Sequence, residues 1–292
     1  MKIRVSLSVK QFKQRAEDTW NLKEWGGITD PDKELLFFGL FNDRDWNVFD
    51  NFKGKKSVFW CGTDILQSLK DYERQRILRN HLAGTKHYCE NEVEAKELEQ
   101  LGLKPIIIPS FLDNINNYPV SFKPSKTPHI FLCGHTEREE EYGLGIIRRI
   151  APRVPYATFH IYGVDKNSSF FTSAPSELDR LVNTDTEHFN IWYHGKIPEG
   201  QFNNEIMQYH CGLRTNEHDG FSEVTAKSLL LGQYPITKIP FEKIWNYKTE
   251  DELVALIDKL RYVIEPNYET RAYYLKQFNN FPWCQKNWYE PK

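Results

Sequence analysis

Several features that mark other protein classes are missing from this sequence of 292 residues. No apolar run reaches the roughly 18 residues that a membrane-spanning helix needs. Residues 1–9 alternate like a strand and lack the apolar stretch and cleavage site of a secretory signal peptide. The five cysteines are scattered, with no CxxC pair and no Cys/His cluster at zinc spacing, which argues against a zinc site and a disulfide framework. We therefore expect a cytoplasmic chain with free thiols.

An excess of charge of either sign is also missing. The chain has 38 Lys and Arg against 40 Asp and Glu, a formal net charge of -2, so no general attraction to nucleic acid or anionic lipid is expected. Low-complexity tracts and internal repeats are not visible either. Hydrophobic residues make up 40% of the chain and aromatic residues 14%, which is typical of a globular protein with a substantial core.

Short apolar runs alternate with helical patterns along the chain, a rhythm that predicts βαβ units. The expected strands are 2–9, 34–40, 57–61, 85–89, 104–109, 129–133, 158–162, 190–194, 211–214 and 234–236. Helices are expected from about 65 and over 92–101, 144–150, 199–208, 222–231 and 250–262. A polar stretch at about 112–128 predicts a linker. The sequence thus predicts α/β domains over 1–120 and 121–270, followed by an aromatic segment over 271–292.

Three predicted strands of the second domain end at or beside a glycine: Gly134, Gly163 and Gly195. Open α/β sheets bind ligands outside the carboxyl ends of their strands, so these glycines are expected at a ligand-binding edge. A tight strand-to-helix turn would also require glycine there.

The most informative segment is the polar loop that begins at Arg214 and leads into the helix predicted over 222–231. The first turn of a helix has free backbone N–H groups, which attract phosphate. Arg214 is a candidate phosphate ligand, although a surface ion pair would equally explain it. Asp219 with Gly220 is either a simple turn or part of a site.

This loop resembles the signature of retaining GT-B glycosyltransferases (glycosyltransferase group 1, family 4-like). The signature has an acid, Gly, an apolar residue, Gly or Ser, and a second acid eight positions after the first; Asp219-Gly220-Phe221-Ser222 matches its first part. Gly232 and Tyr234-Pro235-Ile236 match the helix end and the next strand. Lys227 stands where the second acid is expected. In the family that carboxylate holds the donor ribose, whereas Lys227 could reach a phosphate or a ring carbonyl.

The resemblance implies two Rossmann-like domains facing across a cleft, the GT-B architecture. It also implies transfer of a sugar from a nucleotide-sugar donor to a glycan, lipid-linked or other hydroxyl acceptor, with retention. The donor is a substrate, and neither a cofactor nor an obligatory metal is expected. Polysaccharide biosynthesis would be the setting of such a reaction.

The candidate site residues follow from this resemblance and from the strand ends. The predicted catalytic residues are Asp64, His218 and Asp219, and no metal ligands are predicted. The predicted donor-binding residues are Gly134, His135, Arg138, Gly163, Gly195, Arg214, Gly220, Phe221, Ser222 and Lys227. Asp64 would also suit the start of the helix expected near 65. A loop histidine such as His218 is more often simply exposed, and a helical lysine such as Lys227 is more often solvated.

Two other functions remain open at this stage. A nucleotide-sugar epimerase shares the scaffold and the donor, and a non-catalytic nucleotide-sugar or glycan-binding protein would explain the loss of the acid at Lys227. The expected partners are a nucleotide sugar and a glycan or lipid-linked acceptor, and no nucleic acid. The aromatic segment 271–292 is either a peripheral contact with a membrane surface or a brace that returns to the first domain.

Overall fold

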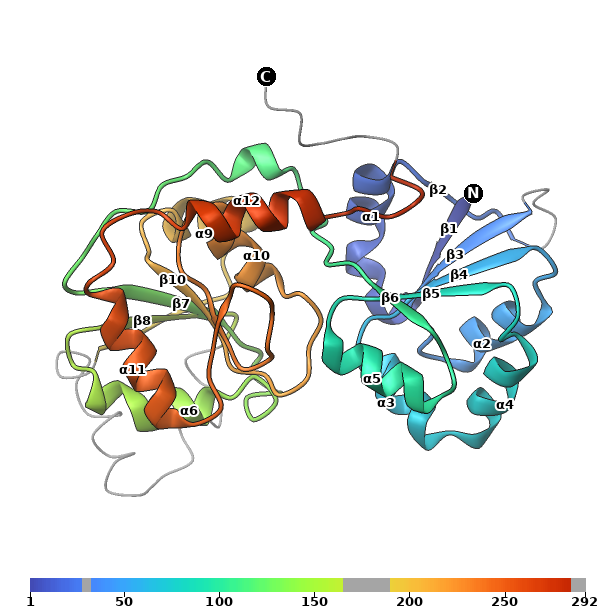
Figure 1. Cartoon of the computed structure of the whole chain (residues 1–292), viewed down its shortest axis with the longest axis horizontal. Helices are drawn as coiled ribbons and strands as arrows, with labels where there is room; N and C mark the ends of the chain where they lie inside the picture. Colours follow the sequence, from blue (N-terminus) through green and yellow to red (C-terminus); the bar gives the residue numbers. More distant parts are fainter. Residues whose placement is uncertain (28–32, 165–189, 285–292) are drawn as a thin grey trace. The chain divides into compact units, whose positions relative to one another are not determined.

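A computed structural model describes residues 1–27, 33–164 and 190–284 of the chain (Figure 1). The chain divides into two compact units. Unit 1 comprises residues 1–114, 218–221 and 273–292, and unit 2 comprises residues 115–217 and 222–272. The short segment 218–221 therefore belongs to unit 1, although unit 2 precedes and follows it in the sequence. The end of the predicted aromatic segment, 285–292, lies outside the described residues.

Unit 1 is a six-stranded parallel sheet in the order β2-β1-β3-β4-β5-β6. Its strands are β1 (Lys2–Val5), β2 (Lys23–Glu24), β3 (Glu34–Phe38), β4 (Lys55–Phe59), β5 (Thr85–Cys89) and β6 (Pro105–Ile107). Its helices are α1 (Lys13–Trp20), α2 (Asp43–Asn51), α3 (Thr63–Lys70), α4 (Tyr72–Asn80) and α5 (Glu92–Gln100). A 3-10 helix, η1, covers Leu7–Phe12.

Helices cover both faces of this sheet, which is why the central strand β3 is continuously apolar and buried over residues 35–38. In Figure 1, α1 lies on one side of the sheet and α2 to α5 lie on the other. Trp20 of α1 packs against Phe38 and Phe59 on the first face. Phe37 points to the opposite face and contacts Phe49 of α2. Neighbouring residues of β3 thus serve two separate cores.

Unit 2 contains a second six-stranded parallel sheet, in the order β12-β11-β10-β7-β8-β9. Its strands are β7 (His129–Cys133), β8 (Thr158–Tyr162), β9 (Ile191–Gly195), β10 (Cys211–Arg214), β11 (Ile236–Thr237) and β12 (Trp245–Asn246). Its helices are α6 (Leu144–Ile150), α9 (Glu199–Ile206), α10 (Glu223–Leu230) and α11 (Glu250–Leu260), and 3-10 turns cover Ile115–Asn117 and Ala151–Arg153. Helix α12 (Tyr268–Gln277) begins in unit 2 and ends in unit 1.

The order of the strands in unit 2 creates a topological switch point. From β7 the chain adds β8 and β9 on one side, and it then adds β10, β11 and β12 on the other side. β7 and β10 are neighbours in the sheet, and the connections that follow them run in opposite directions along it. In open α/β sheets this is where ligands bind, outside the carboxyl ends of the strands.

The predicted α/β class with two Rossmann-like domains is confirmed by the two parallel sheets. The predicted strand 2–9 is wrong in its second half, because β1 ends at Val5 and residues 7–12 form the 3-10 helix. The Ser6 side chain accepts a hydrogen bond from Ser8 N and begins that helix. None of the helices in the described residues has both the length and the apolar sequence needed to cross a membrane.

Candidate functional site

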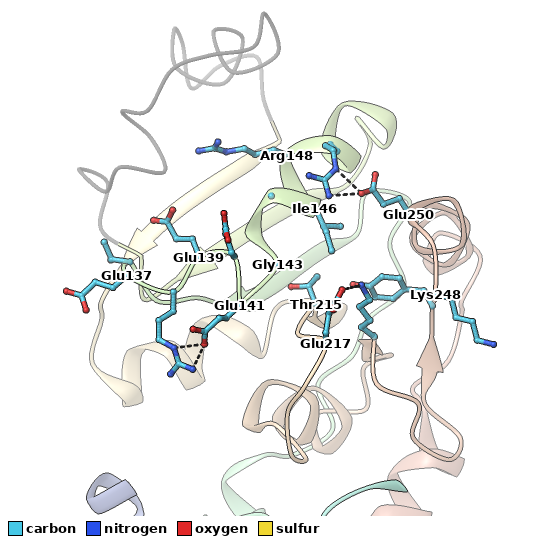
Figure 2. A pocket seen from close by; sticks show the side chains of 17 residues that line it. Glu137, Glu139, Glu141, Gly143, Ile146, Arg148, Thr215, Glu217, Lys248 and Glu250 are labelled. Carbon is cyan, nitrogen blue, oxygen red and sulfur yellow. Dashed lines mark hydrogen bonds and ion pairs between the residues drawn. The ribbon is translucent and has the colours of Figure 1, made fainter. Parts of the chain in front are cut away.

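A pocket of about 980 Å³ lies at the switch point of unit 2 (Figure 2). Its walls come from segments that follow β7, β10, β11 and β12. The lining residues are Thr136, Glu137, Arg138, Glu139, Glu140, Glu141, Gly143, Gly145, Ile146, Arg148, Arg149, Thr215, Glu217, Lys238, Tyr247, Lys248 and Glu250. In Figure 2, the glutamates after β7 lie on one side of the pocket, and Lys248 and Glu250 lie on the other.

Contacts between the segments after β7 and β10 hold one wall of the pocket together. The Thr215 hydroxyl donates a hydrogen bond to the Tyr142 carbonyl. Gly143 has a left-handed φ of 63°, and a Cβ there would lie 2.8 Å from Thr215 Cβ. The guanidinium of Arg214 lies 4.8 Å from the centre of the Tyr142 ring, a cation–π distance. Arg214 thus stands beside the pocket at the end of β10.

The lining of the pocket is rich in charges of both signs. Five lining residues are Lys or Arg and six are Glu. Arg138 Nε donates to Glu141 at 2.7 Å, Arg149 pairs with Glu250 at 2.7 Å, and Lys238 pairs with Glu217 at 2.7 Å. Such exposed pairs are each worth less than about 1 kcal/mol. An anionic ligand can therefore replace these carboxylates as a partner of the cations at little cost.

The three predicted glycines lie together at the carboxyl edge of the sheet. Gly134 N donates to the Tyr162 carbonyl at 2.8 Å, and Gly163 N donates to the Gly195 carbonyl at 2.7 Å. A Cβ on Gly163 would lie 2.5 Å from the Gly134 carbonyl oxygen. Since Gly163 also has a φ of 81°, this approach of adjacent strand ends requires glycine. His135 is half-buried beside Gly134, and its Nδ1 accepts from Glu137 N at 3.3 Å.

Lys227 has its partners inside unit 2, between α9 and α10. Its side chain is only 2% exposed. Its Nζ donates to Glu199 Oε1 and to Asn203 Oδ1, each at 3.0 Å, and lies 3.5 Å from a carboxylate oxygen of Glu223. These contacts give Lys227 a structural task, and donor binding by it stays a prediction. Ser222 begins α10 by accepting a hydrogen bond from Thr225 N at 3.2 Å.

The remaining predicted residues, Asp64 and the segment 218–221, belong to unit 1. The Asp64 carboxylate is fully buried and accepts backbone hydrogen bonds from Leu40, Cys61 and Ile65 at 3.0 to 3.1 Å. Burial raises its pKa to about 6, against the effect of these hydrogen bonds. Helix α3 begins at Thr63 with Gly62 as its N-cap, so Asp64 lies in the first turn and joins the ends of β3 and β4.

The segment His218–Phe221 packs against an acidic cluster at the end of β5, formed by Glu90, Glu94 and Glu97. His218 Nε2 lies 2.8 Å from Glu97 Oε2, and Phe221 N donates to Glu90 Oε2 at 3.0 Å. Burial raises the pKa of Glu90 to about 7, and burial together with the charge of Glu90 raises the pKa of Glu94 well above its usual value. Neither Glu90 nor Glu94 was predicted from the sequence, because both resemble ordinary residues at the start of a helix.

A row of histidines crosses unit 2 and was also not predicted. His129 Nδ1 lies 2.9 Å from His160 Nε2, and His160 Nδ1 lies 3.0 Å from His194 Nε2. His194 Nδ1 lies 3.5 Å from Glu205, and His129 N donates to His210 Nδ1 at 2.9 Å. Burial lowers the pKa of His160 to about 3. Within the described ranges, no group of three or more His, Cys, Asp or Glu side chains is arranged to hold a metal ion.

Neither a protein-family model nor a curated protein matches this sequence. The fold, however, is similar to solved glycosyltransferase structures. Sucrose-phosphate synthase from Thermosynechococcus elongatus aligns with a TM-score of 0.63 and 12% identity, over 86% of this chain and 71% of that one. The apo lipopolysaccharide outer core galactosyltransferase WaaB aligns with a TM-score of 0.61 and 11% identity, over 94% and 78%.

The pneumococcal O-GlcNAc transferase GtfA, solved with UDP and GlcNAc, aligns with a TM-score of 0.53 and 15% identity, over 83% of this chain. This chain spans 53% of that transferase and 51% of TarM, about half of each. These similarities establish the GT-B fold for the chain. At such low identity they concern the fold alone.

Proposed function

We propose that this chain is a glycosyltransferase that binds a nucleotide-sugar donor in the switch-point pocket of unit 2. The sugar passes to a hydroxyl of a glycan or lipid-linked acceptor, with retention and without an obligatory metal. The observation that carries this proposal is the position of the pocket: it lies at the carboxyl edge of a parallel sheet, where the strand order reverses.

The chemistry of the pocket lining fits a nucleotide sugar. A diphosphate needs cations, and Arg138, Arg149 and Lys238 provide them once their exposed glutamate partners are displaced. Ribose and hexose hydroxyls need acceptors, which the remaining lining carboxylates offer. The solved complex of the pneumococcal transferase with UDP and GlcNAc makes a uridine nucleotide the first choice of donor.

The reaction needs stabilisation of the leaving diphosphate more than it needs a strong base. Cations fixed around the pocket would stabilise the negative charge that develops on the leaving group. Gly134, Gly163 and Gly195 would let the donor approach the backbone closely, and Arg214 would add a cation at the end of β10. Asp219 and His218 are the proposed catalytic side chains.

A thermal-shift and calorimetric panel tests the proposed donor site. UDP, UDP-glucose, UDP-galactose, UDP-GlcNAc and GDP would be titrated into the wild type, Arg138→Ala and Arg149→Ala. We expect one uridine nucleotide to raise Tm by mass action, and each variant to weaken its Kd about tenfold, or about 1.4 kcal/mol. Arg153→Ala is the matched control, because Arg153 pairs with Asp251 in the same unit and does not line the pocket.

Three results separate the candidate functions. Release of UDP that depends on an added acceptor supports transfer. Conversion of one nucleotide sugar to another without release of UDP identifies an epimerase. Binding without either reaction identifies a non-catalytic protein, and the absence of any nucleotide binding contradicts the donor site itself.

A further inference from the structure

We infer that Glu90, Asn91 and Glu97 are positioning residues for the predicted catalytic segment His218–Phe221. We name these three residues the α5 clamp, because they lie at the start of α5 and along it. The inference rests on the proposed function, since it gives these residues a role in the transfer reaction. All of the contacts that support it lie within unit 1.

Each member of the clamp holds a different residue of the segment. Glu90 Oε2 accepts a hydrogen bond from Phe221 N at 3.0 Å. The Asn91 side-chain amide donates to the Asp219 carbonyl at 2.8 Å. Glu97 Oε2 lies 2.8 Å from His218 Nε2. Three contacts within four consecutive residues fix both the path of the backbone and the imidazole ring.

Asn91 performs two tasks with one side chain. Its Oδ1 accepts hydrogen bonds from Val93 N at 2.9 Å and from Glu94 N at 3.0 Å, which caps α5. Its Nδ2 then points away from the helix and donates to Asp219. Because the cap fixes the amide plane, the donor to Asp219 is already oriented.

Glu90 is itself rigid, so it can define a position. Its Oε1 accepts from both Ser110 N at 2.9 Å and Ser110 Oγ at 2.6 Å. A Cβ on Gly220 would overlap Glu90 Oε2, so glycine is needed for the segment to approach this carboxylate. The Phe221 ring packs against the rings of Tyr274 and Phe278, with centroid distances of 4.9 Å and 5.4 Å.

Several carboxyl groups lie close to the clamp. Asp219 and Glu94 interact electrostatically with Glu90, and Asp64 interacts with Glu94. His218 contacts Glu97 and lies near Gly62, where a Cβ would be 3.4 Å from its Cε1. The clamp therefore places carboxylates beside the segment as well as fixing its position.

Asn91→Ser tests the clamp, because serine keeps an N-cap oxygen and loses the donor to Asp219. Asn91→Asp is a second variant that keeps the cap and turns a carboxylate oxygen toward the carbonyl. Asn42→Ser is the matched control: Asn42 caps α2 in the same unit and makes no contact with the segment among the hydrogen bonds of the described residues. We expect donor Kd to stay within about twofold in all three, and kcat to fall about 10- to 100-fold in the Asn91 variants only.

Hydrogen exchange provides a readout that does not depend on activity. A peptide that covers 218–221 should exchange faster in both Asn91 variants and not in Asn42→Ser. Unchanged exchange would overturn the clamp, and faster exchange with unchanged kcat would overturn its role in positioning for the reaction. If the wild type transfers no sugar from any donor, the proposed function fails, and exchange alone decides whether the clamp holds the segment.

Discussion

Lys227 in unit 2 and Glu94 in unit 1 are both enclosed ionisable side chains, yet the protein stabilises them in opposite ways. Lys227 has two carboxylates and an amide oxygen around its ammonium group. Glu94 Oε2 accepts a hydrogen bond from Glu90 N at 2.8 Å, and its Oε1 has no hydrogen-bond partner among the described residues. Burial without a countercharge favours the neutral acid and raises the pKa of Glu94, whereas the ammonium group of Lys227 has carboxylates as partners.

The largest loss of stability is expected from removing the side chain of Lys227. Lys227→Ala would leave Glu199, Asn203 and Glu223 without their shared cation and would open a cavity under Tyr118 and Phe202. We expect a loss of about 3 kcal/mol in the free energy of unfolding, measured by urea denaturation. Lys238→Ala, which removes an exposed pair, should cost less than about 1 kcal/mol; equal losses would contradict the buried pairing.

The second largest loss of stability is expected where the acidic cluster contacts the segment 218–221. Gly220→Ala would force a Cβ onto Glu90 Oε2, which Ser110 holds in place. We expect a loss of about 2 kcal/mol from this overpacking, seen as a lower Tm. Gly200→Ala is the control: Gly200 lies in α9 with open space around its Cβ, so this substitution should leave Tm unchanged or raise it slightly. A Tm equal to that of the wild type would show that the segment does not lie against Glu90.

Glu94→Gln tests the protonation of Glu94 through the pH dependence of the unfolding free energy. A carboxyl whose folded pKa is raised stabilises the fold below its unfolded pKa of about 4.5, and this contribution is lost as pH rises, because only the unfolded chain releases the proton. Between pH 4.5 and 7, the decline in unfolding free energy should therefore be shallower in Glu94→Gln, by up to about 1.4 kcal/mol per pH unit. Glu92→Gln, at an exposed site on the same helix, should run parallel to the wild type, and parallel curves for both variants would refute the protonated state.

The smallest effect on stability is expected in the pocket of unit 2. Arg138 and Glu141 are both about half exposed, so Arg138→Ala should cost less than about 0.5 kcal/mol in unfolding free energy. The same variant should weaken nucleotide binding about tenfold. A large loss of stability together with unchanged nucleotide binding would show that Arg138 has a structural role and does not bind the donor.

Much of the fold was predictable because the apolar runs are clear. The strands at 85–89, 129–133, 158–162 and 211–214 have the predicted bounds. Helices α1 and α4 were not predicted, since α1 buries only Ala16 and Trp20, and α4 only Ile77 and Leu78. Two buried positions in a helix give too weak a periodicity to detect in one sequence.

The candidate site was predictable in its strand ends and much less in its long-range contacts. The glycines at the ends of β7, β8 and β9 meet at one edge because parallel strands end together. The clamp joins residues separated by 121 to 131 positions in the sequence, and no local pattern encodes such a contact. Lys227 gave no sign of burial, because its partner Glu199 comes from another helix.

The histidine row in unit 2 has a direction. A single hydrogen fits between His129 and His160, and another between His160 and His194. At the far end the carboxylate of Glu205 can only accept, which favours the tautomer with hydrogen on Nδ1 in all three rings. A change of tautomer in one ring would require the same change in its neighbours. A substitution at Glu205 would therefore remove the preference for hydrogen on Nδ1 as far as His129, which lies two strands from His194.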